Sequence, residues 1–264
     1  MGGATLSQFI GRKKRTDGHI ALVGAAFAIL AIAASVVVIV PPNETTAETR
    51  PEMSVGAGGL ENLSALFPRT AEYDFVAPKA GTYELPSLKQ APGGKLVDMR
   101  GEHVELGPLL KGRMSLVSFV YLLCSDTNGC PVALSTLFEV FDGSAMAPGL
   151  KDHLQLVTIS FDPERDTPEA LESFAFPVNS DPKADQKLDW HFLTSTGDEE
   201  LKPVLDGFGQ SVMRVADSDT INHLLRMYLV DEQGRIRNVY GLGMIDPRLL
   251  MSDVETLLLE AKGS

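Results

Sequence analysis

The sequence is poor in cysteine and in basic residues. It has two cysteines in 264 residues, which excludes a disulfide-rich scaffold, because such scaffolds need many cysteines in a short chain. Its 23 lysines and arginines are outnumbered by 35 aspartates and glutamates, which gives a formal net charge of −12. A surface this acidic argues against nucleic acid as a partner, because phosphate contacts depend on clustered basic side chains.

One long apolar run lies near the beginning of the chain. Residues 20–40 carry no charge, and a helix of this length spans about 30 Å, the thickness of the hydrocarbon core of a bilayer. Basic residues 12–15 precede the run and Glu44 and Glu48 follow it. The positive-inside rule then predicts a cytoplasmic basic segment (1–19), a single transmembrane anchor (20–40) in the inner (plasma) membrane, and a periplasmic or extracytoplasmic remainder. A cleaved signal peptide is the alternative, since residues 31–35 include small side chains.

The composition and pattern of the segment after the anchor change near residue 82. Residues 41–81 are rich in Pro, Gly, Ala, Thr and Glu and are predicted to be a tether, with some order around residues 60–67. Residues 82–85, 95–99 and 103–106 are short extended runs separated by glycine-containing turns, which predicts an N-terminal hairpin region. About 180 residues follow the tether, enough for one domain with its own core.

The rest of the chain alternates between strand and helix patterns. Its apolar runs predict buried strands at residues 115–121 and 154–161, and two late strands at 224–230 and 235–240 are joined by a turn at Asp231–Gly234. Helices are predicted at 131–141, 167–174, 199–208 and 247–261. This order predicts an α/β, thioredoxin-like domain over residues 82–264, with a central mixed sheet flanked by helices.

The two cysteines share one loop, Cys124-Ser-Asp-Thr-Asn-Gly-Cys130-Pro131, between a predicted strand and a predicted helix. Cys130 therefore lies at a helix N-terminus, whose free N–H groups and partial positive charge favour a thiolate. A thiolate is the soft ligand that Cu(I) prefers. The loop alone leaves three interpretations open, which are a structural disulfide, a redox pair and a metal site.

Five histidines occur in the chain. A lone histidine is usually a surface or satisfied core residue, and His19, His103 and His153 are interpreted in that way. His191, which follows Trp190, is a weak alternative ligand. His223 differs, because it opens a predicted strand that runs into the late hairpin.

Four ordered motifs resemble the Sco/SenC copper proteins. They are a cysteine pair followed by proline after a buried strand, Ser160-Phe-Asp-Pro-Glu-Arg-Asp-Thr-Pro-Glu169, Trp190-His-Phe-Leu-Thr194, and a histidine before an aliphatic strand ending Tyr-Leu-x-Asp-x-x-Gly, here His223 to Gly234. The resemblance covers about residues 82–262, and an anchor is typical of the family. It implies that Cys124, Cys130 and His223 bind copper as Cu(I) or Cu(II).

The resemblance also implies a function. Such a protein is expected to be a metallochaperone that delivers copper to the copper-site subunit of a respiratory haem–copper oxidase, or to another copper protein, and so supports cytochrome c oxidase assembly. The alternative is a thiol–disulfide oxidoreductase that keeps partner cysteines reduced, with Cys124 and Cys130 as its redox pair. A structural disulfide without metal is the third interpretation. His223 separates them, because copper binding needs it and a dithiol reductase does not.

The chain departs from the family pattern at two positions. Five residues separate its cysteines where the family usually has three, so Cys124 must lie in a loop that folds back toward Cys130. Asn222 stands where an acidic residue commonly precedes the histidine, which removes a negative charge near the metal. In the acidic motif, Asp162 and Thr167 are expected to turn and cap the chain rather than to bind metal.

Overall fold

The computed structural model describes residues 59–67, 75–216 and 218–263. The predicted basic segment (1–19) and transmembrane anchor (20–40) lie outside these residues, as does most of the predicted tether. No helix in the described ranges is both long enough and apolar enough to cross a bilayer.

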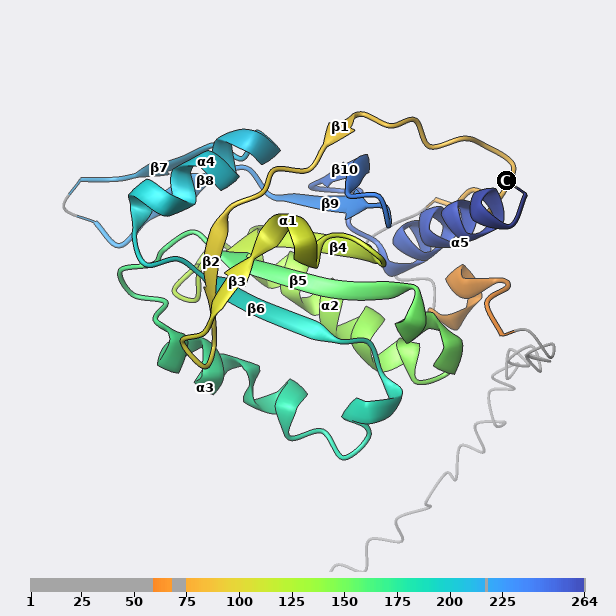
Figure 1. The fold of residues 1–264 in the computed structure, drawn as a ribbon, viewed down its shortest axis with the longest axis horizontal. Coiled ribbons are helices and arrows are strands. Elements are labelled where there is room, and N and C mark those ends of the chain that lie inside the picture. The colour runs from red at the N-terminus through yellow and green to blue at the C-terminus, as the bar shows by residue number, and fades with distance from the viewer. Residues whose placement is uncertain (1–58, 68–74, 217, 264) are drawn as a thin grey trace, which may run out of the picture. The chain divides into compact units, whose positions relative to one another are not determined.

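Eight strands form a mixed central sheet, as predicted (Figure 1). Strands β4, β5 and β6 are parallel to one another and all other neighbours pair antiparallel. The strands lie in the order β1 (Lys89–Gln90), β10 (Arg235–Gly241), β9 (Arg226–Val230), β4 (Met114–Val120), β5 (Leu154–Ser160), β6 (Trp190–Thr194), β2 (Lys95–Asp98), β3 (His103–Glu105).

The predicted N-terminal hairpin exists as β2 and β3, and β2 pairs with β6. Residues 82–85 were expected to be extended in the same region, but they form no strand. They follow Gly81, whose φ of 73° turns the chain, and Leu85 packs into the core instead of pairing with a strand. The prediction for these four residues is therefore wrong.

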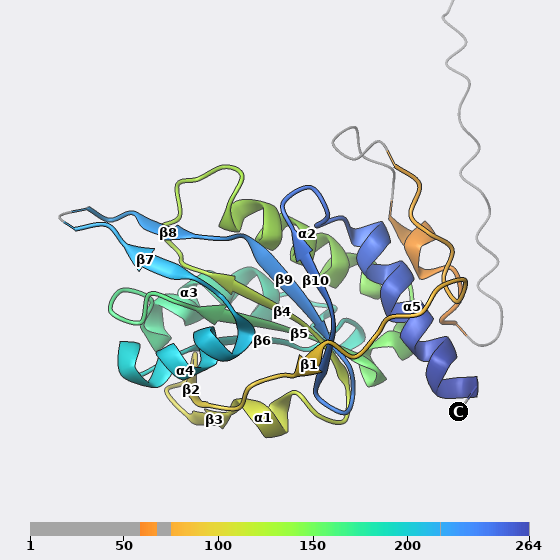
Figure 2. The same ribbon diagram turned by 90° about the horizontal axis from the view of Figure 1, so that it is seen from above.

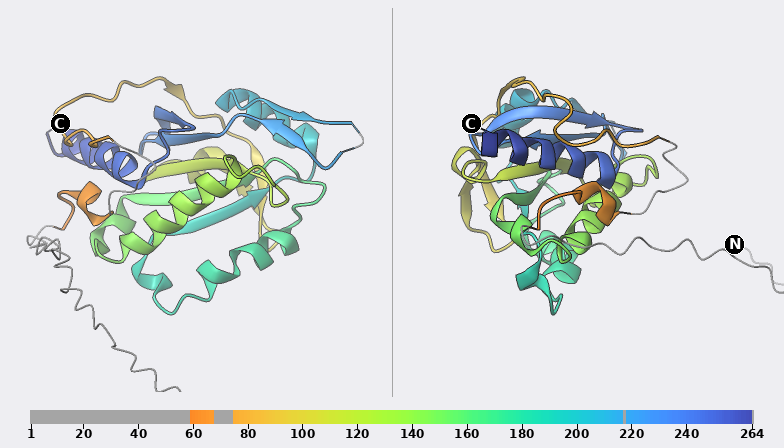
Figure 3. Two further views of the ribbon diagram at one scale, coloured as in Figure 1. Left: turned by 180° about the vertical axis from the view of Figure 1, so that it is seen from behind. Right: turned by 90° about the vertical axis from the view of Figure 1, so that its right-hand side faces the viewer.

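Helices cover both faces of the sheet. On one face α2 (Cys130–Ser144), α3 (Pro168–Asn179) and α5 (Pro247–Gly263) share a core with Leu116 and Phe192. On the other face α1 (Leu106–Leu109) and α4 (Asp198–Phe208) pack with Val117 and Phe119. Neighbouring residues of β4 thus serve opposite cores, because successive strand side chains point to opposite faces. Figure 3 shows α2 lying across its face of the sheet. Three short 3-10 helices, η1 (Leu63–Leu66), η2 (Pro148–Asp152) and η3 (Ala184–Gln186), complete the elements.

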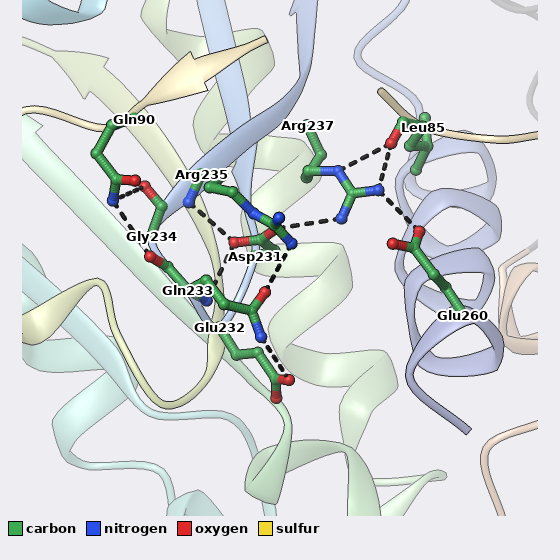
Figure 4. Close-up of polar contacts among 9 residues, drawn as sticks. All are labelled: Leu85, Gln90, Asp231, Glu232, Gln233, Gly234, Arg235, Arg237 and Glu260. Carbon is green, nitrogen blue, oxygen red and sulfur yellow. Dashed lines mark hydrogen bonds and ion pairs between the residues drawn. The ribbon is translucent and has the colours of Figure 1, made fainter. Parts of the chain in front are cut away.

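Near α5, the Arg237 side chain joins three segments that are distant in sequence. The Arg237 guanidinium donates Nε–H to the Leu85 carbonyl at 2.8 Å and also contacts Asp231 at 3.1 Å and Glu260 at 2.7 Å (Figure 4). These contacts tie the coil before β1, the β9–β10 turn and the end of α5 together. Gln90 extends the network to the turn by donating to the Gly234 carbonyl at 2.8 Å.

A second, two-stranded sheet was not predicted. Strands β7 (Val212–Arg214) and β8 (Ile221–His223) pair antiparallel and project beyond the main sheet (Figure 2). The expected strand over 224–230 begins only at Arg226, and the Leu224 carbonyl accepts a hydrogen bond from the Gln210 side chain at 2.6 Å instead of one from a neighbouring strand. His223 therefore ends β8 instead of opening β9, which corrects the prediction.

The order expected around residues 60–67 is present as η1, which is held against α5. The Glu255 carboxylate accepts the backbone N–H groups of Asn62 and Leu63 at 3.0 and 2.9 Å, and Leu63 is buried. A buried donor that loses its acceptor costs the desolvation of that group. Glu255 is thus the main polar anchor of η1 on the domain.

Replacing Glu255 by Ala is expected to lower the free energy of unfolding by about 1–3 kcal/mol, because two backbone donors lose their acceptor. Chemical denaturation of the full chain measures this change. Glu172→Ala on the exposed face of α3 is the matched control and should change stability by less than about 0.5 kcal/mol. Equal effects of the two substitutions would refute the assignment of Glu255 as an anchor.

Candidate metal centre

The cysteine loop leaves β4 and returns to the start of α2, which begins at Cys130 with Pro131 in its first turn. Asp126 folds the loop back, since its carbonyl accepts the Gly129 N–H at 2.9 Å and its carboxylate accepts the Asn128 N–H at 3.0 Å. Gly129 lies so close to Cys124 that an added Cβ would sit 3.3 Å from the Cys124 sulfur. The fold-back expected from the five-residue spacing is confirmed.

Three side chains converge at this point. The sulfurs of Cys124 and Cys130 and a ring nitrogen of His223 all lie within 4.8 Å of one another, and His223 Nε2 is 3.6 Å from Cys130 Sγ. No other group of three possible ligands of the types His, Cys, Asp and Glu occurs within the described residues. The structure brings together all three residues predicted as ligands, and their role as ligands stays a prediction.

The other histidines lie elsewhere. His191, the weak alternative ligand, is on β6 beside Val157, and burial lowers its pKa. It does not belong to the Cys–Cys–His group. His103 and His153 are exposed. Only His223 faces the cysteines among the histidines that the structure describes.

The surroundings of the His223 ring favour the tautomer that leaves Nε2 free to bind a metal ion. Its Nδ1 lies 3.0 Å from the Ile221 carbonyl, which can only accept, so Nδ1 carries the proton. The lone pair is therefore on Nε2, the atom that faces Cys130. A backbone carbonyl that holds the far ring nitrogen is the usual way in which proteins orient a ligating imidazole.

Two aromatic rings form the wall behind His223. The Phe161 ring centroid is 4.9 Å from that of His223, and the Tyr121 centroid is 5.7 Å away in an edge-on arrangement. Burial raises the pKa of the Tyr121 hydroxyl. Neither ring is among the predicted site residues, although Tyr121 lies three residues before Cys124 and Phe161 lies inside the acidic motif.

The state of Cys130 differs from the expectation. Its side chain is only 1% exposed, and burial raises the pKa of its thiol far above the ordinary value. The helix N-terminus was expected to favour the thiolate, but the cost of an unpaired charge in a dry site outweighs the partial charge of the helix. Burial therefore disfavours the Cys130 thiolate when no metal ion is bound.

The donor set fits a soft metal ion. Two sulfurs and one imidazole nitrogen converge, and Cys124 remains half-buried, so one side of the group is accessible. Sulfur donors select Cu(I), and imidazole suits both copper oxidation states. Binding a cation here must release the thiol protons, which couples affinity to pH.

Asn222 does not face this group. It lies on β8 between Ile221 and His223, is exposed, and pairs with Met213. Successive side chains of a strand point to opposite faces, so Asn222 points away from the side that carries His223. The acidic motif also contributes no ligand, and Thr167 caps α3 as predicted by accepting the Ala170 N–H at 3.3 Å.

A thioredoxin-like sheet with two thiols and an imidazole at the start of its first long helix defines a class of thiol-based metal or redox proteins. The profile of the SCO1/SenC family matches residues 93–259. The chain belongs to the SCO1/SenC family.

Individual relatives agree with this assignment. An SCO2-like protein of Rickettsia conorii is 32% identical over 187 residues, which are 69% of this chain and 82% of the relative. The structure of Arabidopsis thaliana ScoI with copper bound covers 64% of this chain and 98% of its own, with 24% identity and a TM-score of 0.53. The structure of BsSco, described as having a disulfide switch, covers 66% and 97%, with 24% identity and a TM-score of 0.51. Both structures share the fold.

The two cysteines should differ in reactivity. Cys124 is half-buried, whereas Cys130 is buried and burial raises the pKa of its thiol. Iodoacetamide should therefore modify Cys124 at least about tenfold faster than Cys130, because the thiolate is the reactive form. Peptide mass mapping after brief treatment of the reduced full chain measures the ratio. In denaturant the rates should converge, and equal rates in the folded protein would contradict the assignment.

Proposed function

We propose that this protein is a membrane-anchored copper metallochaperone, in which Cys124, Cys130 and His223 carry copper for delivery to the copper site of a respiratory haem–copper oxidase. One observation carries the proposal, which is the position of His223. Its Nε2 lone pair faces the Cys130 sulfur at 3.6 Å while its Nδ1 is held by a carbonyl. A dithiol redox pair has no need of an imidazole oriented in this way.

Copper as the cargo is supported by the donor set and by the family. Thiolate sulfurs suit Cu(I), and the added imidazole gives Cu(II) a nitrogen ligand, so one site serves both oxidation states. The structure of Arabidopsis thaliana ScoI contains copper. BsSco is described as a member of a family of cytochrome c oxidase assembly proteins, and this points to an oxidase copper-site subunit as the recipient here.

The cellular location follows from the sequence. The basic residues before the apolar run 20–40 favour a single-pass anchor with the domain on the periplasmic or extracytoplasmic side. A reporter fused after Ser264 should be active only outside the cytoplasm. A mature chain that starts after residue 35 would show cleavage and end the anchor proposal.

A thiol–disulfide oxidoreductase is the second candidate function. Cys124 and Cys130 are both free and their sulfurs belong to one group within 4.8 Å, so a disulfide between them needs little movement. BsSco, with the same fold, is described as having a disulfide switch. On this alternative the protein would reduce partner cysteines, and His223 would be dispensable.

Replacing His223 by Ala should separate the two functions. Cu(II) affinity is expected to fall more than about 100-fold, beyond the effect of losing an outer-shell partner, because Cu(II) loses its nitrogen ligand. Cu(I) affinity should fall less, since two sulfurs remain. Disulfide formation between the cysteines should be nearly unchanged, and Cys130→Ser should abolish copper binding and disulfide formation together.

Competition titration of the reduced full chain with each copper ion measures these affinities. His103→Ala, on an exposed strand at the edge of the sheet, is the matched control and should behave as wild type. A wild-type protein that binds neither ion while its dithiol reduces a partner would replace the copper function by the reductase function. A disulfide inert to mild reductants would leave a structural role.

A further inference from the structure

The acidic motif that supplies no ligand has two fully buried carboxylates. Asp162 and Asp166 lie between β5 and α3 and are 0% and 1% exposed. Carboxylates are rarely buried unless paired or hydrogen-bonded, because removing their charge from water is costly. The candidate metal centre has two parts, the β7–β8 sheet with His223 (the histidine arm) and the loop with Cys124 (the cysteine arm). Each carboxylate is linked to a different one of these arms.

Asp162 holds the arm that carries His223. Its Oδ1 accepts from Arg214 Nη1 at 2.7 Å, and Arg214 ends β7 directly opposite Ile221 of β8. His223 follows two residues later in β8 and contacts the Ile221 carbonyl through its ring. Arg214, the partner of Asp162, therefore lies in the strand that pairs with the strand of His223.

Arg165 adds a second link to the same arm. Its Nε lies 3.3 Å from Asp162 Oδ2, and its Nη1 donates to Asp219 at 2.8 Å. Asp219 lies in the connection between β7 and β8. The two arginines together attach both the strand and the connection of this small sheet to the end of β5.

Asp166 holds the arm that carries the cysteines. Its Oδ2 accepts the Leu122 N–H at 3.0 Å and the Ser160 hydroxyl at 2.6 Å. Leu122 belongs to the start of the cysteine loop, two residues before Cys124. The Asp166 carboxylate thus fixes the point from which the loop departs.

We propose that Asp162 and Asp166 are positioning residues that bridge the two arms of the site, setting the His223 imidazole through Arg214 and the cysteine loop through Leu122. This inference deepens the proposed function, because positioning these side chains serves copper binding only if that function holds. It concerns residues that bind no metal. Its first test uses the metal-free protein, so it is judged separately from copper binding.

The histidine arm is tested by NMR of the reduced, metal-free full chain with labelled histidine rings. The Phe161 and Tyr121 rings lie within 4.9 and 5.7 Å of the His223 ring, so their ring currents should displace its resonances from those of exposed histidines. Arg214→Met should return the His223 resonances toward the exposed values. Arg214→Lys keeps the charge that faces Asp162 and should restore part of the displacement.

Arg113→Met is the matched control. Arg113 is 30% exposed against 33% for Arg214, and it pairs with Asp189 at 2.7 Å near the start of β4, away from the cysteine end of that strand. It should leave His223 unchanged. If Arg214→Met fails to fold because the buried Asp162 charge keeps only the 3.3 Å contact with Arg165, the double variant Asp162→Asn with Arg214→Met removes that charge and carries the test.

Copper binding gives a second readout for this arm. Arg214→Met should lower Cu(II) affinity about 10–100-fold, the usual range for residues that orient a ligating histidine, and change Cu(I) affinity much less. A general loss of stability would not lower the Cu(II) affinity selectively. In that case Arg214→Lys would also not restore the Cu(II) affinity relative to the Cu(I) affinity. A wild-type chain that binds no copper ends the proposed function, while the NMR comparison still decides the positioning role.

The cysteine arm is tested by equilibrium with glutathione, in which two protein thiols form one disulfide and one oxidised glutathione yields two reduced ones. Asp166→Ala frees the base of the loop, so the equilibrium constant should fall about tenfold, as expected when roughly one residue must be ordered again on closure. Asp166→Asn keeps an acceptor for Leu122 and should behave close to wild type.

Two results would overturn the proposal. Unchanged His223 resonances in the Arg214 variants would refute the positioning role of Asp162. An unchanged glutathione equilibrium in Asp166→Ala would refute the positioning role of Asp166. Displaced resonances with selective loss of Cu(II) and partial recovery by Lys would support the first arm. A tenfold shift that Asn reverses would support the second.

Discussion

A charge buried at the end of β5 is the constraint on which the local architecture depends. The Asp162 side chain is fully buried, and an uncompensated carboxylate in that position is strongly unfavourable. Arg165 and Arg214 supply the opposite charge, and Arg214 can do so only if β7 lies over this end of the sheet. An isolated two-stranded sheet is at best marginally stable in water, so β7 and β8 need this anchor. The same packing leaves His223 beside Cys130.

Burial also explains the chemistry of the three donors. Burial raises the pKa of the Cys130 thiol, and the Ile221 carbonyl holds the Nδ1 side of the His223 ring, so that Nε2 faces this cysteine. A protonated Cys130 avoids repulsion between two thiolates in a low-dielectric site. A cation that displaces the thiol protons supplies its own compensating charge. Such a site can be stable without metal and still bind a soft cation.

The parts of the fold that could be predicted are those whose signal is local. Strands β4 and β5 are continuous apolar runs, and the turn before β10 contains Gly234 with a φ of 78°. Strands β7 and β8 have three residues each and no clear alternation of apolar and polar side chains. A tertiary ion pair stabilises them, so their sequence does not predict them. The approach of His223 to the cysteines was accordingly expected only from the family resemblance. The pKa of Cys130 depends on burial, which spacing does not reveal.

The wide cysteine spacing can be reconciled with a compact site by the turn within the loop. Asp126 accepts the N–H groups of Asn128 and Gly129, and this turn accommodates the two residues beyond the usual three. The reversal brings the Cys124 sulfur against Gly129, where an added Cβ would also lie 3.2 Å from the Asp126 carbonyl. Any larger residue would push the sulfur or the turn outward. Glycine before Cys130 is thus the local condition under which a longer loop brings both sulfurs into one group with His223.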